Sequence, residues 1–162
     1  MKVVLQRVSE ASVGVVNELG TLDPTFEPQQ IAPGFMILVG VTDEDGDKQI
    51  AWLAHKILNL RVFEDAQGRM NRSIQDIGGE ILSISQFTLF ADVHKGNRPS
   101  FIKAGKPEHA DLMWIKFNEA LRSGGVPVKE GRFGAHMRVG LVNDGPVTII
   151  IDTEHDMPDG TR

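Results

Sequence analysis

The sequence predicts an α+β domain in which a mainly antiparallel, barrel-like β-sheet carries two packed helices. Two segments have helical spacing of apolar residues, and strand-like runs separate them without strict strand–helix alternation or an internal repeat. The length of 162 residues suits one compact domain, and no segment resembles a linker. We therefore expect a single domain over residues 1–162, with residues 153–162 forming a frayed end.

Strand-like runs dominate the N-terminal part of the chain. Lys2–Val8 has strand character, and Ala11–Val16 continues it after a bend. Asn17–Gly34 contains three prolines and two glycines, which indicates an irregular, extended excursion. Phe35–Val41 is a continuous apolar run of strand length, so we expect it to be buried on both faces.

The two helices have recognisable ends. Lys48–Asn59 follows an acidic stretch, which favours the positive end of a helix dipole, and it presents one apolar face. Pro107 is suited to the first turn of the second helix, because a first-turn proline forfeits no hydrogen bond. Glycines at 124 and 125 are expected to end this helix as a left-handed cap. Further strands are predicted at Leu60–Glu64 and Glu80–Phe90.

The C-terminal strand pattern is interrupted at an unusual place. Met137–Asn143 and Val147–Ile151 read as two strands, joined by a turn at Asp144, Gly145 and Pro146. Proline has no N–H to donate to a β-ladder and fixes its own φ angle. The Gly-Pro step is therefore placed to display main-chain carbonyl groups.

The composition excludes several classes of protein. A hydrophobic content of 41% and a charged content of 24% are globular values, and the longest apolar run is too short to span a membrane. The first residues lack a signal-peptide core, so a cytoplasmic location is expected. The absence of cysteine removes disulfides, thiolate nucleophiles and cysteine-based zinc sites. A net charge of −5 argues against nonspecific coating of nucleic acid, and we expect no DNA partner.

One segment is locally basic. Residues 93–107 contain four cations and no acid: Lys95, Arg98, Lys103 and Lys106. Such a loop suits contact with one phosphate-bearing ligand. It is equally compatible with a solvated loop whose lysines maintain solubility.

Common catalytic motifs are missing. The five histidines are scattered, and the sequence has no H-E-x-x-H, G-x-S-x-G, P-loop or G-x-G-x-x-G motif. We expect no cofactor and no metal. Ile81–Asp92 places Ser85, Gln86 and Thr88 near the end of an apolar strand, a pattern that can supply polar groups to a pocket. Taken alone, the pattern rather favours Thr88 as a strand former and Gln86 as a solvated side chain.

Several segments together carry a resemblance. The segments SQFTLFAD (85–92), NDGPVT (143–148), KGNRPSF (95–101) and GRFGAHM (131–137), with LQRV (5–8) and RVFED (61–65), resemble the D-aminoacyl-tRNA deacylase family over nearly the whole chain. The excursion Asn17–Gly34 departs from the family, because it is longer and richer in proline than expected.

The resemblance implies a cofactor-free esterase with the deacylase fold. Family members hydrolyse the ester between a D-amino acid and the 3′-terminal ribose of tRNA, and they are homodimers. Their Gly-Pro step is a cis peptide inserted into the partner's pocket, so Gly145 and Pro146 are expected to face Ser85–Thr88 of the other subunit. Their carbonyl groups would hold the substrate amine, and an L residue would drive its Cβ into the main chain. Glycine has no Cβ, so action on mischarged glycyl-tRNA(Ala) is also expected.

The resemblance also assigns roles to individual residues. Catalysis uses either Thr88 as a nucleophile or the ribose 2′-OH with main-chain N–H donors, and we favour the second scheme. Phe133 and Met137 are expected to line the pocket or, alternatively, to pack in the core. Arg7 is expected to orient the Gly-Pro loop or to be a surface cation. The predicted catalytic residues are Ser85, Gln86, Phe87 and Thr88; the substrate-binding residues are Gly145, Pro146, Phe133, Met137 and Arg7; the tRNA-binding residues are Lys95 and Arg98.

Two other functions remain open at this point. The chain could be a catalytically silent, dimeric tRNA-binding protein of the same fold. It could also hydrolyse small esters or amides, which would require a self-sufficient nucleophile and base that the sequence does not show.

Overall fold

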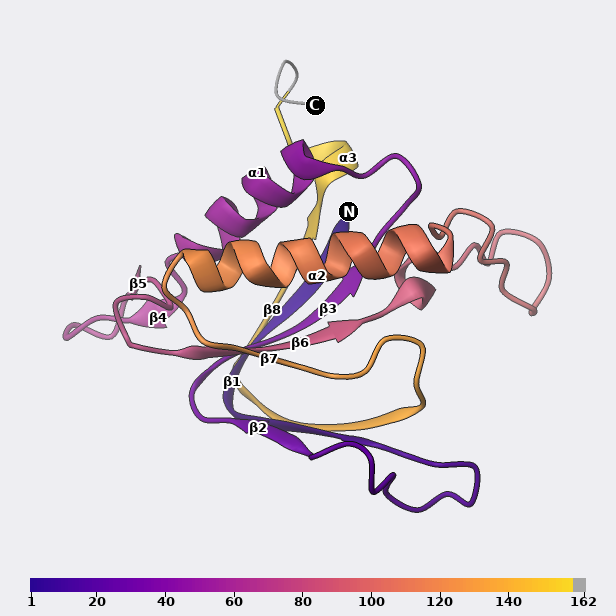
Figure 1. Cartoon of the computed structure of the whole chain (residues 1–162). Coiled ribbons are helices and arrows are strands. Elements are labelled where there is room, and N and C mark those ends of the chain that lie inside the picture. Colours follow the sequence, from indigo (N-terminus) through magenta and orange to yellow (C-terminus); the bar gives the residue numbers. More distant parts are fainter. Residues whose placement is uncertain (159–162) are drawn as a thin grey trace.

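A computed structural model describes residues 1–158 of the chain (Figure 1). The strands are β1 (Lys2–Val15), β2 (Gln29–Ile31), β3 (Gly34–Gly40), β4 (Phe63–Glu64), β5 (Met70–Arg72), β6 (Glu80–Ser85), β7 (Val128–Glu130) and β8 (Met137–Asp152). The helices are α1 (Asp47–Leu58), α2 (Pro107–Ser123), α3 (Thr153–Asp156) and the short 3₁₀ helix η1 (Phe87–Phe90).

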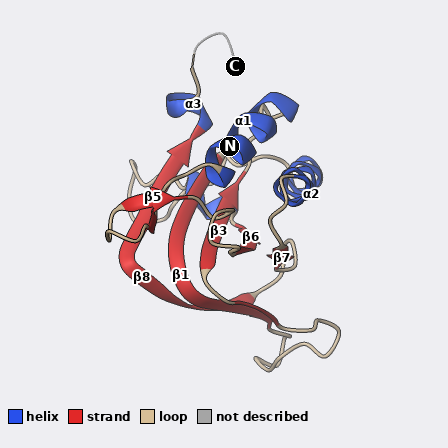
Figure 2. Cartoon of the chain, turned by 90° about the vertical axis from the view of Figure 1, so that its left-hand side faces the viewer, coloured by secondary structure: helices blue, strands red, loops and turns tan. Residues whose placement is uncertain are grey.

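The main sheet is strongly curved and is covered on one face by α1 and α2 (Figure 2). Its strand order is β2-β1-β3-β6-β7, and β8 pairs with the other edge of β1. The pairs that involve β1 are antiparallel, whereas β3–β6 and β6–β7 are parallel. The predicted α+β class with a barrel-like sheet is thus confirmed, and the parallel pairs are a feature that the sequence pattern did not indicate.

Two apolar cores lie on opposite faces of the sheet. Phe35 and Ile37 of β3 point into the larger core, which the helices close with residues such as Phe117. Met36, which alternates with them, points into a second core with Leu82. This arrangement explains why β3 is apolar throughout, and it confirms the predicted burial on both faces.

Both predicted helices are present within one residue of the expected ends. Pro107 is the first residue of α2, and α1 buries the predicted apolar stripe. The cap of α2 differs in one detail, because Gly124 has φ −77° and Gly125 is the left-handed residue at φ +88°. Gly124 closes the helix by donating its N–H to the Ala120 carbonyl at 3.2 Å.

The predicted strand Glu80–Phe90 is wrong beyond Ser85. The Gln86 N–H still donates to the Val39 carbonyl at 2.8 Å, after which the chain turns into η1. This turn packs on the end of β3, where a Cβ at Gly40 would lie 2.8 Å from the Phe90 ring. Thr88 is therefore not a strand residue. The strand expected at Leu60–Glu64 is likewise reduced to β4, which forms a separate two-stranded sheet with β5.

The segment NDGPVT is a bulge within one strand and not a turn between two strands. Asn143 pairs with Val8, and Thr148 pairs with Gln6, so β8 continues in one direction along β1. Residues 144–147 lie opposite Arg7 alone, and they form a local protrusion that we call the Gly-Pro bulge. Asn143 spans it by donating from Nδ2 to the Val147 carbonyl at 3.2 Å.

The expected frayed end is also partly wrong. Thr153–Asp156 form α3, in which the Glu154 N–H donates to the Asp152 carboxylate at 3.0 Å. Met157 is 2% exposed. The rest of the expected frayed end, residues 159–162, lies outside the described residues. Within the described residues, no helix combines the length and apolar character needed to cross a membrane.

Asn118 is a buried polar residue in α2 whose two side-chain polar atoms find no hydrogen-bond partner among residues 1–158. An unpaired buried amide costs roughly 1–3 kcal/mol, and leucine has a similar shape without polar atoms. We expect Asn118→Leu to raise the free energy of unfolding by about 1–2 kcal/mol in urea titrations. Destabilisation by this substitution would show that water or a local rearrangement satisfies the amide.

Candidate active site

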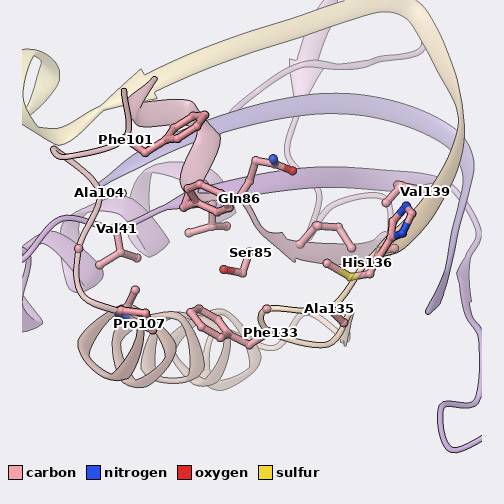
Figure 3. Close-up of a pocket in the computed structure, with 17 residues that line it drawn as sticks. Val41, Ser85, Gln86, Phe101, Ala104, Pro107, Phe133, Ala135, His136 and Val139 are labelled. Atoms are coloured by element: carbon pink, nitrogen blue, oxygen red, sulfur yellow. The ribbon is translucent and has the colours of Figure 1, made fainter. Parts of the chain in front are cut away.

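A pocket of about 590 Å³ opens beside the carboxyl ends of β3 and β6 (Figure 3). One side is formed by Ser85, Gln86 and Phe87, and the opposite side by the start of α2 and residues 133–137. Figure 3 shows Ser85 pointing into the space between Gln86 and Phe133. This volume falls in the range of ordinary small-molecule binding sites.

Phe87 forms part of the pocket mouth. Its side chain is 57% exposed, and its ring meets that of Phe101 edge to face, with centroids 5.0 Å apart. The sequence segments SQFT and KGNRPSF thus meet at the entrance, because η1 turns Phe87 away from the sheet. The exposed Phe87 ring, backed by the half-buried Phe101, offers flat apolar surface to a ligand at the pocket mouth.

Thr88 lies outside the pocket lining, and its hydroxyl group has an unsuitable partner for activation. The Gln86 side-chain amide donates to Thr88 Oγ1. An amide has no basic nitrogen and cannot take up a proton from the hydroxyl. The contact therefore orients Thr88 without making it a stronger nucleophile. The local expectation that Gln86 merely faces water is wrong, since Gln86 lines the pocket.

Residues 131–136 connect β7 to β8, and we call them the wall loop because Phe133–His136 line the opposite side of the pocket. Phe133 lines the pocket and also packs 6.2 Å from the Trp114 ring. Trp114 is fixed in turn by donating Nε1–H to the Ser83 hydroxyl at 2.9 Å. Met137 also lines the pocket, so the lining role and the packing role coexist at this side.

His136 is a pocket residue that the sequence interpretation missed. Among the described residues that line the pocket, it has the one ionisable side chain. The available signal was its place in GRFGAHM, directly before Met137. The pocket otherwise offers apolar groups, a serine, an amide and the main chain.

Arg7 supports the Gly-Pro bulge from below. It is only 5% exposed, so the alternative of a surface cation is wrong. Its Nε donates to the Asp144 carbonyl at 3.0 Å, and its Nη1 donates to the Val62 carbonyl at 2.6 Å. The Gly145–Pro146 bond is cis, and both residues are exposed. Neither residue lines the pocket of its own chain.

Lys95 and Arg98 are exposed on the loop that follows η1. Asp92 and Ser100 close this loop through reciprocal main-chain hydrogen bonds of 2.8 and 2.9 Å. The loop leads directly to Phe101 at the pocket mouth. Both cations are thus close in sequence to the residue at the pocket mouth, although they do not line the pocket.

One cluster of metal-ligating side chains lies elsewhere in the described residues. It consists of Asp152, Glu154 and His155 at the start of α3. Asp152 already pairs with Lys2 at 3.2 Å and with His155 at 3.3 Å. These internal pairs account for the cluster, and it has no part in the pocket.

Comparison with known proteins assigns the chain to a family. A family model described as D-Tyr-tRNA(Tyr) deacylase matches residues 4–152. A curated relative from Bifidobacterium longum subsp. infantis, named D-aminoacyl-tRNA deacylase, is 98% identical over 162 residues and is matched over 100% of both chains. The chain belongs to the D-Tyr-tRNA(Tyr) deacylase family.

Solved structures agree with this membership. A structure titled c-Myc DNA Unwinding Element Binding Protein has a TM-score of 0.81 and 42% identity, over 94% of this chain and 98% of that one. A probable eukaryotic D-amino acid tRNA deacylase has a TM-score of 0.76 at 17% identity, over 93% and 97% of the two chains. This second likeness concerns the fold. As a member of the deacylase family the protein is an enzyme, and the pocket is its candidate active site.

Proposed function

We propose that the protein hydrolyses the ester bond between a D-amino acid and the 3′-terminal ribose of tRNA, and that it works in the cytoplasm as a homodimer. The observation that carries the proposal is the pocket in which Ser85–Phe87 face Phe133 and Met137. The size of this preformed pocket and the family membership favour one large substrate. The lack of a side-chain nucleophile–base pair among the lining residues also favours such a substrate over a small ester. Phe87 and Phe101 at its mouth suit a nucleoside end.

Each pocket is completed by the other subunit. Ser85 pairs with Val39, which pairs with Val3 of β1, and β8 lies beyond β1. Three strand spacings separate β6 from β8, or about 14 Å along the sheet. The Gly-Pro bulge is displaced further, to the level of Arg7. The bulge and the pocket of one chain are therefore badly placed to form a single site. A two-fold axis can place the bulge of each subunit over the pocket of its partner.

The main chain of the Gly-Pro bulge is proposed to discriminate D- from L-amino acids. Carbonyl groups of Gly145 and Pro146 hold the substrate amine and Cα, while the ester carbonyl lies near Ser85–Thr88. With both ends fixed, a D side chain points outward and an L side chain collides with main chain, so L substrates are rejected by a clash. Chemically diverse D-aminoacyl-tRNAs are accepted, and glycyl-tRNA(Ala) is hydrolysed because glycine has no Cβ.

Hydrolysis uses the tRNA and the main chain more than protein side chains. The terminal 2′-OH positions or activates water, and main-chain N–H groups near Phe87 and Thr88 hold the developing oxyanion. The first N–H groups of a helix lack partners within the helix, and η1 begins at Phe87. Such a donor typically contributes about 3–4 kcal/mol to lowering the barrier.

A comparison of matched substrates tests the proposed function. Purified protein in the presence of a chelator is given D- and L-aminoacyl-tRNA, glycyl-tRNA(Ala) and free aminoacyl esters, and its mass in solution is measured by light scattering. We expect a dimer that hydrolyses the D and glycyl substrates alone. Binding without turnover would instead indicate a silent tRNA-binding protein, and turnover of free esters would indicate a small-molecule hydrolase.

The role of Thr88 can be tested separately. Thr88→Ala removes the hydroxyl group but leaves the main-chain N–H groups, so we expect the single-turnover rate to fall less than about tenfold, or about 1.4 kcal/mol. With a tRNA that ends in 2′-deoxyadenosine, the single-turnover rate should fall far more. A rate at background level for Thr88→Ala, or a trapped acyl-Thr88, would support the nucleophile scheme instead.

Lys95 and Arg98 are proposed to contact phosphates of the acceptor end. Each neutralised phosphate releases counterions, so binding weakens as salt rises. In the double variant Lys95→Ala/Arg98→Ala we expect the slope of log affinity against log salt to become shallower by about one to two units. An unchanged slope in filter-binding titrations would remove both residues from the tRNA contact surface.

A further inference from the structure

The wall loop is fastened to the sheet near its two ends. At the first end, the Gly131 N–H donates to the Ser83 carbonyl at 3.1 Å. At the other end, the His136 carbonyl accepts from the Val16 N–H at 2.8 Å. Phe133, the residue that faces Ser85 across the pocket, lies between these two points. The position of Phe133 therefore depends on what holds the middle of the loop.

Arg132 makes the contacts that hold this middle part from outside the pocket. Its Nη1 forms an ion pair with the Asp23 carboxylate at 2.8 Å, and its Nη2 donates to the Thr25 carbonyl at 2.9 Å. Its guanidinium also lies 5.3 Å from the centroid of the Phe26 ring. These partners belong to residues 16–28, which we call the β1–β2 connection. Most of this connection lies within Asn17–Gly34, the stretch that the sequence predicts to be an irregular excursion.

The β1–β2 connection is itself fixed, so it can serve as a support. The Asn17 carboxamide oxygen accepts N–H groups from Leu19 and Thr21 at 3.0 and 3.1 Å. The Asp23 N–H donates to the Val15 carbonyl at 2.9 Å. Hydrogen bonds from Thr25, together with the nearby guanidinium group, hold the pKa of Asp23 below its usual value, so this carboxylate is ionised at neutral pH.

Phe26 provides a second anchor, because it packs against the second core. A planar guanidinium group can hold a carboxylate, a carbonyl and an aromatic face at once, which a lysine ammonium cannot do. Arg132 therefore connects a pocket residue, through one peptide bond, to a rigid support outside the pocket. This contact set is built from several side chains, unlike an isolated surface ion pair.

We propose that Arg132 is a positioning residue for the proposed deacylation, and that it sets the place of Phe133 by joining the wall loop to Asp23, Thr25 and Phe26 of the β1–β2 connection. Phe133 forms the pocket surface before and during the reaction, so Arg132 affects ground state and transition state alike. Loss of such uniform binding raises KM and leaves kcat nearly unchanged. The β1–β2 connection then supports the substrate site without contacting the substrate.

The test uses Arg132→Met, which retains most of the apolar stem. We expect KM for D-aminoacyl-tRNA to rise about five- to tenfold while kcat changes less than about twofold. Arg132→Lys should recover only part of the loss. Asp23→Ala should reproduce the rise in KM, and the double variant should be no worse than either single variant, because both break one connection.

Arg138→Met is the matched control. Arg138 also donates to the β1–β2 connection, at the Gly20 carbonyl and 3.1 Å, but it is not part of the wall loop. We expect its KM to remain at the wild-type value. Hydrogen exchange of residues 131–137 should accelerate in Arg132→Met and Asp23→Ala and not in Arg138→Met.

The two readouts separate this inference from the proposed function, on which it rests. Unchanged exchange and an unchanged KM in Arg132→Met would overturn the positioning role, as would a loss of kcat and of unfolding temperature at constant KM. Faster hydrogen exchange in Arg132→Met would still support the contact between the wall loop and the β1–β2 connection if the wild-type protein did not deacylate D-aminoacyl-tRNA. That combination would reject the proposed function and not the positioning contact.

Discussion

Replacing Gly145 by alanine is expected to lower kcat/KM for D-aminoacyl-tRNA by about 100-fold or more, equivalent to about 3 kcal/mol in barrier. Gly145 has φ +131°, which L residues rarely adopt. A Cβ there would lie 2.7 Å from Val147 Cγ2 and 2.9 Å from the Val147 nitrogen. The bulge must therefore change shape, and the carbonyl groups proposed to hold the amine move with it. Single-turnover deacylation measures the effect.

The same variant tests whether sites are shared between subunits. Gly145→Ala retains an intact pocket, and Ala104→Trp, which fills the pocket, retains an intact bulge. Random mixed dimers of the two inactive proteins should recover about a quarter of wild-type activity, because half the dimers are mixed and each has one complete site. Each variant remixed with itself is the control. No recovery in verified mixed dimers would show that bulge and pocket act within one chain.

Removing the guanidinium group of Arg7 is expected to have the second largest effect. Arg7→Met leaves the buried Val62 carbonyl without its donor and frees the Asp144 carbonyl of the bulge. An unpaired buried carbonyl costs about 1–3 kcal/mol, so the free energy of unfolding should fall by that amount. The loss of support for the bulge should also reduce kcat/KM by about 30-fold or more, roughly 2 kcal/mol.

Arg7→Lys should lower kcat/KM nearly as much, because a single ammonium nitrogen cannot occupy both the Nε and the Nη1 positions from which the arginine donates. Arg61→Met is the control, since Arg61 is exposed and donates to the Asn71 carbonyl at 3.0 Å, away from the bulge. Urea unfolding and deacylation assays are compared at a temperature where both variants are folded. Wild-type kcat/KM in a folded Arg7→Met protein would separate the arginine from the bulge's function.

The helices were predictable from sequence because their signals are local. The apolar stripe of α1 and the proline at the start of α2 act within a few residues, and both helices formed as expected. The sheet was less accessible. That β8 passes through the Gly-Pro bulge without reversing depends on its pairing with β1, more than a hundred residues earlier in the chain. The proline pattern alone suggested a turn.

The candidate site shows the same division. Ser85, Gln86 and Phe133 were found through motifs, and the structure brings them to one pocket. Thr88 was misplaced, because strand propensity cannot reveal that η1 packs over Gly40. His136 was missed, since a lone histidine has no recognisable spacing. The contacts of Arg132 join residues more than a hundred positions apart, and no local pattern encodes them.

The placement of the Gly-Pro bulge and the pocket on opposite sides of β1 has a consequence for control of the enzyme. Under the proposed sharing of sites between subunits, a newly made, solitary chain would hold both a bulge and a pocket and yet be unable to combine them. Hydrolysis would begin only when two copies meet, so activity would decline steeply on dilution. The cell could then set the level of surveillance through how much of the protein it makes.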